Sequence, residues 1–440
     1  MPQSRTEARR TIGSYWEASV PQVKLDRQLI GNALFDVAII GAGFAGLSAA
    51  LRLAQAGVSV CVLEAEHVGY GASGRNGGFC CLGGTKLDER RLIKKFGLEE
   101  ARRFVAYQVA GVNLVAQRLD SWGVDADRHS NGEIYLAHRR KDFAGFQAEA
   151  AFLKENFGIK ARVLSKTDLD AEGYGGPTFH GGLQVPYGFA LNPMAYVQAL
   201  ADQVRRAGGK IFGKSPVTGM TRDNDRWQLE TEHGFIRARK VVLAGNGYAR
   251  EDAPKWLHGR TLPVMSSILV TRPLSEGELA AQGWTSDTMA ADTRNLLHYF
   301  RLLPDRRFLF GTRGGIFENA QSLTAMYKRA RSDFDEMFPA WAGIEAEHSW
   351  YGHVCLARNL TPFVGEVPGL GGVYAAMGWH GSGIAMASIS GEKVAGLILG
   401  KLQPEDLPVA LRRPFARFPL PSLRKLYLQG AYWWYGWQDR

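Results

Sequence analysis

Along this 440-residue chain, short apolar runs alternate with segments whose apolar residues recur at the spacing of a helix. Residues 35–40, 58–63 and 240–244 are mainly apolar and rich in β-branched side chains, as in strands buried in a parallel sheet. Residues 44–56, between the first two runs, are good helix formers with a small-residue face. This strand–helix–strand order predicts a βαβ unit.

Helical spacing returns in the middle of the chain. Residues 86–128 predict two helices that part near Gly97, and apolar residues at 105, 109, 112, 115 and 119 share one face of the second helix. Further helices are expected at 14–19, 141–157, 192–206, 325–338 and 385–400. Strands are expected at 132–137, 210–220, 266–272, 296–303, 307–313 and 372–378. The alternating runs 227–231 and 234–238 predict a hairpin.

A glycine motif stands where the first predicted strand meets the first predicted helix. Gly41, Gly43 and Gly46 complete G-x-G-x-x-G, and Glu64 ends the second strand about 20 residues later. The motif allows a tight turn, the approach of a pyrophosphate to the backbone and close packing of helix on strand. An acid at Glu64 is placed to bind a ribose hydroxyl and would repel a 2′-phosphate. FAD or NAD is therefore favoured over NADP.

Composition narrows the class of protein. The chain is 45% hydrophobic and 22% charged with a net charge of +10, and no apolar stretch is long enough to span a bilayer. The first 19 residues lack the apolar core of a signal peptide, so we expect a cytoplasmic protein. The four cysteines show no metal-ligand spacing, and we expect neither a metal site nor nucleic-acid binding.

Several motifs together resemble the glycine oxidase and sarcosine oxidase branch of the D-amino-acid oxidase superfamily of FAD enzymes. Within that branch the closer likeness is to the γ-glutamylputrescine oxidase type, with bacterial pipecolate oxidases also similar. Besides the glycine turn and Glu64, the motifs are GASGRNGG at 71–78, AGNGY at 244–248, WYG at 350–352, TPFVG at 361–365 and GWHGSGI at 378–384.

The resemblance implies an α/β fold in which a Rossmann-like FAD domain is interleaved with an α+β substrate domain on a mainly antiparallel sheet. The FAD domain would comprise residues 1–85, 188–255 and 346–405. The substrate domain would comprise 86–187 and 256–345, followed by an aromatic and basic tail at 406–440.

The resemblance also implies the cofactor residues. These are Gly41, Gly43, Gly46, Glu64, Gly71, Ala72, Ser73, Gly74, Arg75, Asn76, Gly77, Gly78, Val217, Gly245, Gly247, Trp350, Gly378, Gly381, Ser382, Gly383 and Ile384. The 381–384 backbone is expected at the N1/O2 edge of the flavin, where a helix N-terminus stabilises negative charge.

Two departures from the family pattern matter. Sarcosine oxidases attach FAD through a cysteine in the strand before the T-P-F motif. Trp350 is expected at that position here, with Cys355 several residues later, so non-covalent FAD is predicted. Many relatives also have a histidine later in the last loop than His380, so its role does not transfer directly.

The implied reaction moves a hydride from a carbon bearing nitrogen to flavin N5 and yields an imine, after which oxygen or a quinone reoxidises the flavin. Substrate candidates are γ-glutamylputrescine-like amines and cyclic or N-substituted amino acids such as pipecolate. Arg313 could bind a carboxylate, Tyr299 and Trp379 could wall the site, and His380 and His353 could accept a proton. A surface ion pair for Arg313 and sheet packing for Tyr299 are the alternatives.

The segment 408–440 combines arginines, prolines and many aromatic residues. It is expected either to wrap back over the protein or to contact the inner face of a membrane. Two rival functions remain: an NAD-linked dehydrogenase, and a flavin protein whose main role is membrane association or partner binding.

Overall fold

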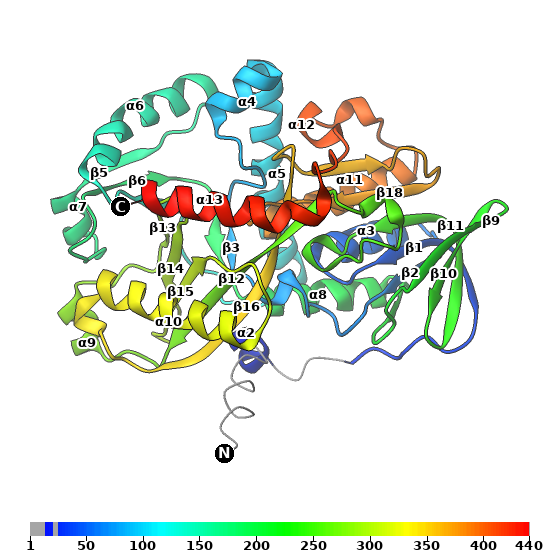
Figure 1. The fold of residues 1–440 in the computed structure, drawn as a ribbon, viewed down its shortest axis with the longest axis horizontal. Coiled ribbons are helices and arrows are strands. Elements are labelled where there is room, and N and C mark those ends of the chain that lie inside the picture. Colours follow the sequence, from blue (N-terminus) through cyan, green and yellow to red (C-terminus); the bar gives the residue numbers. More distant parts are fainter. Residues whose placement is uncertain (1–13, 21–24, 440) are drawn as a thin grey trace.

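The computed structural model describes residues 14–20 and 25–439 and is built on two large sheets. The strands of the first sheet lie to the right in Figure 1 and those of the second to the left. The other part of the lead-in, residues 1–13 and 21–24, lies outside the described residues, as does residue 440. The short helix expected at 14–19 is confirmed as α2 (Tyr15–Ser19).

The first sheet has the parallel order expected of a Rossmann-like unit. Its central strands run β18-β11-β1-β2-β8 and all pair in parallel. They are β1 (Ala33–Ile40), β2 (Val60–Leu63), β8 (Lys210–Phe212), β11 (Gly234–Leu243) and β18 (Val373–Met377), with antiparallel β17 (Phe363–Glu366) at one edge. The predicted hairpin is confirmed: β10 (Arg226–Thr231) pairs with β11, and β9 (Gly219–Asp223) extends it.

Four helices pack together beside this sheet: α3 (Phe44–Gln55), α5 (Leu98–Trp122), α8 (Pro193–Arg206) and α11 (Ile384–Ile398). Helices α3 and α11 approach so closely that a Cβ on Gly391 would lie 2.2 Å from the carbonyl oxygen of Ala45. Buried Arg118 of α5 donates to Ser48 of α3 and to Glu392 of α11, both at 2.8 Å. These contacts fix the glycine turn before α3 relative to the loop before α11.

The second sheet is mainly antiparallel, as expected, in the order β16-β12-β15-β14-β13-β4-β6-β5. Only β13 and β4 pair in parallel. The strands are β16 (Ala346–Ala357), β12 (Thr261–Thr271), β15 (Phe308–Arg313), β14 (His298–Leu302), β13 (Met289–Asp292), β4 (Glu133–Leu136), β6 (Gly181–Val185) and β5 (Arg162–Ser165). Helix α10 (Ala320–Met337) closes an aromatic core on one face, where Phe300, Phe308, Phe310 and Phe334 are fully buried.

The remaining elements surround these layers. They are α4 (Glu89–Phe96), α6 (Arg140–Phe157), α7 (Lys166–Ala171), α9 (Glu276–Gln282), α12 (Val409–Arg412), α13 (Arg424–Gln438) and the paired strands β3 (Phe79–Cys80) and β7 (Phe189–Ala190). The break expected near Gly97 separates α4 from α5, and Gly97 has a φ of 85° there.

Two expectations differ from the structure. The strand predicted at 210–220 is divided into β8 and β9, because Lys214 takes a positive φ of 48° and Pro216 cannot donate to a ladder. Residues 346–357, expected in the FAD domain, instead form β16, which pairs with β12 along 261–271. The rest of the proposed domain division stays a proposal.

Candidate functional site

A cavity of about 570 Å³ is lined by both sheets. On one side lie the carboxyl ends of β1, β2 and β11 with the loops 70–77 and 379–384, and on the other lie residues of β4, β13, β14 and β15. Ligands of open parallel sheets bind outside the carboxyl ends of the strands, and this volume is typical of ligand sites. The cavity is therefore the candidate functional site.

Most residues singled out in the sequence line this cavity. They are Gly41, Gly43, Glu64, Gly71, Ala72, Ser73, Arg75, Asn76, Gly77, Val217, Gly245, Tyr299, Arg313, His353, Trp379, His380, Gly381, Ser382, Gly383 and Ile384. Six others are outside its lining: Gly46, Gly74, Gly78, Gly247, Trp350 and Gly378.

The glycine turn is tightly packed. Gly41 has a φ of 106°, and a Cβ on Gly46 would lie 2.0 Å from the Gly41 carbonyl oxygen, so helix and strand pack without a side chain between them. Gly43 stands at the N-cap of α3 and supplies no side-chain cap. The first turn of α3 therefore offers backbone N–H groups to a phosphate.

Glu64 follows β2 and lines the cavity beside this turn. Its carboxylate accepts hydrogen bonds from the N–H groups of Ala42 at 2.7 Å and Glu66 at 3.0 Å. Burial raises the pKa of Glu64, and these two hydrogen bonds oppose that rise. Each carboxylate oxygen keeps a lone pair for a ligand hydroxyl.

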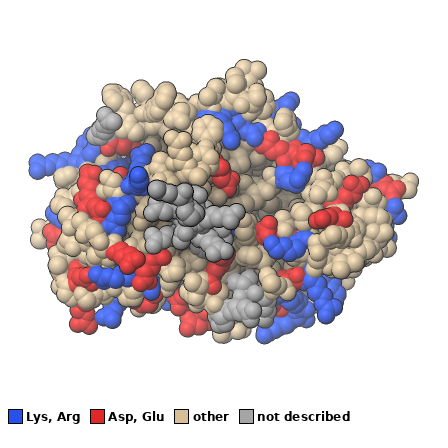
Figure 2. Space-filling view, turned by 60° about the horizontal axis from the view of Figure 1, so that its bottom comes forward, with Lys and Arg blue, Asp and Glu red and all other residues tan. Residues whose placement is uncertain are grey.

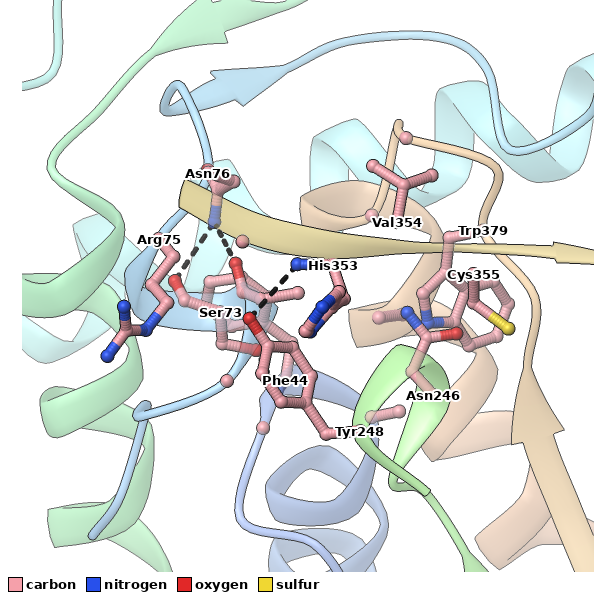
Figure 3. Close-up of a pocket in the computed structure, with 18 of the residues that line it drawn as sticks. Phe44, Ser73, Arg75, Asn76, Asn246, Tyr248, His353, Val354, Cys355 and Trp379 are labelled. Carbon is pink, nitrogen blue, oxygen red and sulfur yellow. Dashed lines mark hydrogen bonds between the residues drawn. The ribbon is translucent and has the colours of Figure 1, made fainter. Parts of the chain in front are cut away.

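The loop 71–78 is held by its own side chains and by its neighbours. Asn76 donates to the carbonyls of Ala72 and Ser73, both at 2.9 Å (Figure 3). It also accepts from the N–H of Gly78 at 2.8 Å. Fully buried Arg301 of β14 donates to the carbonyl of Gly77 at 3.0 Å. Burial lowers the pKa of Arg301 to about 9. Sequence reasoning did not identify Arg301 as a support of this loop.

Trp350, expected at the cofactor, is not among the residues that line the cavity. Its side chain is buried outside the cavity and its indole donates to the carbonyl of Arg75 at 2.9 Å, so Trp350 supports the loop from behind. Cys355, five residues further along β16, lines the cavity instead. Burial raises the pKa of the Cys355 thiol to about 12.

The AGNGY segment links the two sides of the site. Asn246, with a positive φ of 47°, accepts from the N–H of Gly378 at 2.9 Å. The hydroxyl of Tyr248 accepts from the N–H of His353 at 3.1 Å, and their rings lie 5.0 Å apart (Figure 3). Gly247 packs against the His353 backbone, where an added Cβ would lie at 3.1 Å.

The geometry of His380 argues against its expected role as a proton acceptor. Its Nε2 accepts from the N–H of Ala357 at 3.1 Å, so its Nδ1 carries the proton and faces the carbonyl of Gly84 at 3.2 Å. Burial lowers the pKa of His380 to about 4. Both ring nitrogens are committed to the backbone, and the side chain fixes the loop before α11. That helix begins after Gly383 without a side-chain cap.

Tyr299 and His353 both lie on the cavity wall. The Tyr299 hydroxyl lies 3.0 Å from Ser266 Oγ, and its ring covers Gly311, where an added Cβ would lie only 2.1 Å away. Burial raises the pKa of Tyr299, so it stays a neutral phenol at pH 7. Burial lowers the pKa of His353, so the neutral imidazole is favoured.

Two cations on the cavity wall lack partners. Among residues 14–20 and 25–439, no hydrogen-bond or ion-pair partner is found for the side chain of Arg313, at the end of β15, or for that of Lys86. A Cβ on Gly381 would lie 2.9 Å from Arg313 Nη2, which places the guanidinium beside the 379–384 loop. Burial lowers the pKa of both groups, and their mutual repulsion lowers that of Lys86 further. This arrangement suits an anion.

Glu133 of β4 is a buried carboxyl group on the same cavity wall. The hydroxyl of Tyr135 donates to it at 3.1 Å, and burial raises the pKa of Glu133 to about 7. Sequence reasoning missed both Lys86 and Glu133. The signals were a lysine after the glycine-rich run and an acid inside the otherwise apolar run 132–137.

Comparisons with known proteins agree with this architecture. Residues 36–397 match the family described as FAD dependent oxidoreductase. A probable oxidoreductase OrdL from Haemophilus influenzae is 32% identical over 373 residues, covering 83% of each chain. The gamma-glutamylputrescine oxidoreductase of Escherichia coli is 28% identical over 416 residues, covering 94% of each.

Solved structures show the same fold. Glycine oxidase from Bacillus cereus superposes with a TM-score of 0.67 at 21% identity, covering 87% of this chain and 100% of that one. L-proline dehydrogenase from P. horikoshii gives a TM-score of 0.68 at 19% identity, covering 85% and 95%.

The fold and site define a dinucleotide-dependent oxidoreductase. The chain belongs to the FAD dependent oxidoreductase family, and its cofactor is FAD rather than NAD. The site fits this cofactor, because the cavity joins two helix N-termini with glycine at the N-cap, an acid at Glu64 and the supported loop 71–78.

Proposed function

We propose that this enzyme oxidises the carbon–nitrogen bond of an amine or amino acid that also carries a carboxylate. The observation that supports this proposal most strongly is the unpartnered pair Lys86 and Arg313 on the cavity wall. Both side chains are half-buried, and a charge removed from water without a partner is costly, so a site that holds two such cations suits an anion that arrives with the ligand.

We assign FAD to the part of the cavity between Glu64 and the 381–384 loop. Gly41, Gly43 and the loop 71–77 would lie along the pyrophosphate, Glu64 at the ribose and Val217 at the adenine. Gly46 and Gly78 would act through backbone packing rather than direct contact. When bound, FAD accepts the hydride and supplies the redox chemistry.

The remaining wall residues would position the substrate. Lys86 and Arg313 would hold its carboxylate with charge-assisted hydrogen bonds. Tyr299 and Trp379 would form the apolar walls and exclude water. Glu133, with a pKa of about 7, would hold an ammonium group or take its proton, which leaves the neutral amine that hydride transfer requires.

The spacing of these groups favours an extended substrate. Arg313 and Glu133 lie on the outer two of the adjacent strands β15, β14, β13 and β4. Three inter-strand gaps separate those two strands by roughly 14 Å. A γ-glutamylputrescine-like amine carries its carboxylate and amine far apart, whereas in pipecolate both groups are attached to one carbon. We therefore favour the first class over cyclic or N-substituted amino acids.

Oxygen or a quinone would then reoxidise the flavin. We place the reaction in the cytoplasm, because the four cysteines are free and buried, as in proteins of a reducing compartment. Residues 408–440 would hold the enzyme at the inner face of the membrane.

Turnover of three amines tests the substrate class. γ-Glutamylputrescine, putrescine and pipecolate would each be supplied to the purified enzyme, and the carbonyl product of imine hydrolysis would be measured. We expect the highest kcat/KM with γ-glutamylputrescine and a much lower value with putrescine, which lacks a carboxylate. Equal values for the two diamine-derived substrates would contradict the proposed anion site.

A further inference from the structure

The C-terminal helix α13 is fixed to the body of the protein by its inner side. Leu428 is buried with Leu262 and Val264 of β12. Near the start of the helix, Arg424 forms an ion pair with Glu251. The expected wrapping of the tail over the protein is therefore correct for this helix.

The other end of α13 is held as well. Arg139 donates to the carbonyl of Gln438 at 2.5 Å. The carboxylate of Asp439 accepts from the N–H groups of Asn295 at 2.8 Å and Leu296 at 2.9 Å. With both ends anchored, the helix crosses the front of the molecule in a fixed orientation (Figure 1).

The outer side of the same helix is apolar and exposed. Leu426, Trp433 and Trp437 follow the i, i+7, i+11 spacing of one helix face and are 61%, 73% and 65% exposed. Trp434 and Tyr427 flank this face and are also exposed. We call these five residues the aromatic face. A helix of a water-exposed surface normally turns polar residues outward, so this pattern is reversed.

The segment that carries the aromatic face is basic. From Leu407 to Gln438 the chain contains five arginines and lysines and no aspartate or glutamate. Arg413, Arg417 and Lys425 are exposed, and the preceding turn adds Leu420 at 65% exposure. An exposed apolar surface in a segment whose charged side chains are all cations is complementary to a surface that is apolar inside and anionic outside.

We propose that the aromatic face of α13 docks on an anionic membrane surface, with the helix lying in the plane of the interface. Tryptophan and tyrosine prefer the level of the lipid headgroups, and a helix that is apolar on one side lies in that plane. Among the described helices, none is long and apolar enough to cross a membrane. This proposal identifies the helix face and the lipid charge that would hold the enzyme at the membrane, and it depends on the membrane location proposed above.

Co-sedimentation with vesicles tests the proposal on the FAD-loaded full chain. We expect binding to vesicles of phosphatidylglycerol and phosphatidylcholine and weak binding to phosphatidylcholine alone. The double variant Trp433→Ser/Trp437→Ser should lower the partition coefficient at least tenfold. Neutralising Arg417 and Lys425 to glutamine should lower binding to the anionic vesicles roughly fivefold per charge, and 0.5 M salt should mimic that loss.

A matched control removes two exposed apolar side chains elsewhere, in the double variant Ile30→Ser/Leu34→Ser. These residues are 83% and 61% exposed and lie in and before β1. We expect the control to bind vesicles like the unchanged enzyme. Equal loss in both double variants, or no binding of the unchanged enzyme to anionic vesicles, would overturn the proposal.

Two further readouts separate this inference from its rivals. Amine turnover without vesicles should be unchanged in the tryptophan variant, so lost docking is distinguished from a failure of the proposed reaction. The sedimentation mass of the protein without lipid should equal that of one chain at every concentration used and should be the same in the variant. A dimer that the tryptophan substitutions dissociate would show that a second copy covers this face, and would overturn membrane docking.

Discussion

Replacing Lys86 with methionine removes one of the two cations on the cavity wall and keeps an unbranched side chain of similar length. A hydrogen bond between an ammonium and a carboxylate contributes about 1.5–3 kcal/mol. If Lys86 holds the substrate carboxylate, kcat/KM for γ-glutamylputrescine should fall roughly 10- to 150-fold. The value for putrescine, which has no carboxylate, should change by less than about threefold.

The same substitution should stabilise the protein without substrate. The Lys86 side chain has no partner among the described residues, and burial lowers its pKa well below the ordinary value of 10.5. The unfolded chain therefore binds more protons than the folded one between the lowered pKa and 10.5, and the stability of the unchanged protein rises with pH in that window. The gain from Lys86→Met should shrink as the pH rises through that window towards 10.5, as measured by urea unfolding.

Lys95→Met is the matched control. Lys95 is exposed, lies outside the cavity lining and donates to the carbonyl of Asn359 at 3.1 Å. We expect no change in either kinetic constant. A Lys86→Met enzyme that is less stable and equally impaired with both amines would refute the reasoning, since Lys86 would then be a structural residue.

Three other predictions follow from single contacts. Gly46→Ala places a Cβ 2.0 Å from the Gly41 carbonyl oxygen, so it should lower the free energy of unfolding by about 1–3 kcal/mol and lower the FAD content. In the control Gly145→Ala, the new Cβ meets open space inside α6, and the free energy of unfolding should rise by up to about 1 kcal/mol. Glu133→Gln should abolish the rise of kcat/KM through pH 7 that ionisation of Glu133 produces, and an unchanged pH profile would exclude this role. Acid precipitation should release the flavin into the supernatant; flavin retained in the pellet would indicate a covalent bond, with Cys355 as the thiol to replace first.

The local sequence pattern was sufficient to predict the helix and strands of the cofactor half of the fold. The apolar runs at 35–40 and 58–63 and the helix between them appear as β1, β2 and α3. Gly41 and Gly46 could be assigned because their roles depend on the chain within a few residues. The antiparallel sheet came from the family resemblance, since no local pattern fixes which distant strands pair.

Long-range pairing explains what was missed. β16 follows the substrate segment in sequence, and only its pairing with β12 places it in the second sheet. That register turns the Trp350 indole towards Arg75 and leaves Cys355 on the cavity wall. The sequence could not show that both nitrogens of His380 are used by backbone groups, because their partners are distant in the chain.

Functional side chains that lie outside sequence motifs could not be predicted either. Lys86 and Glu133 stand in segments that predict only a loop and a strand, and they face the same cavity because β4 lies in the sheet over the loop 79–86. What reveals each of them is an ionisable group in a cavity with too few partners, which requires the three-dimensional structure.

The visible spectrum of the purified enzyme under anaerobic conditions tests both the cofactor and the reaction. We expect flavin absorbance that bleaches when γ-glutamylputrescine is added and that persists when putrescine is added at the same concentration. Flavin absorbance that no carboxylate-bearing amine bleaches would contradict the proposed reaction, and no flavin absorbance after incubation with FAD would contradict the assignment of the cavity itself.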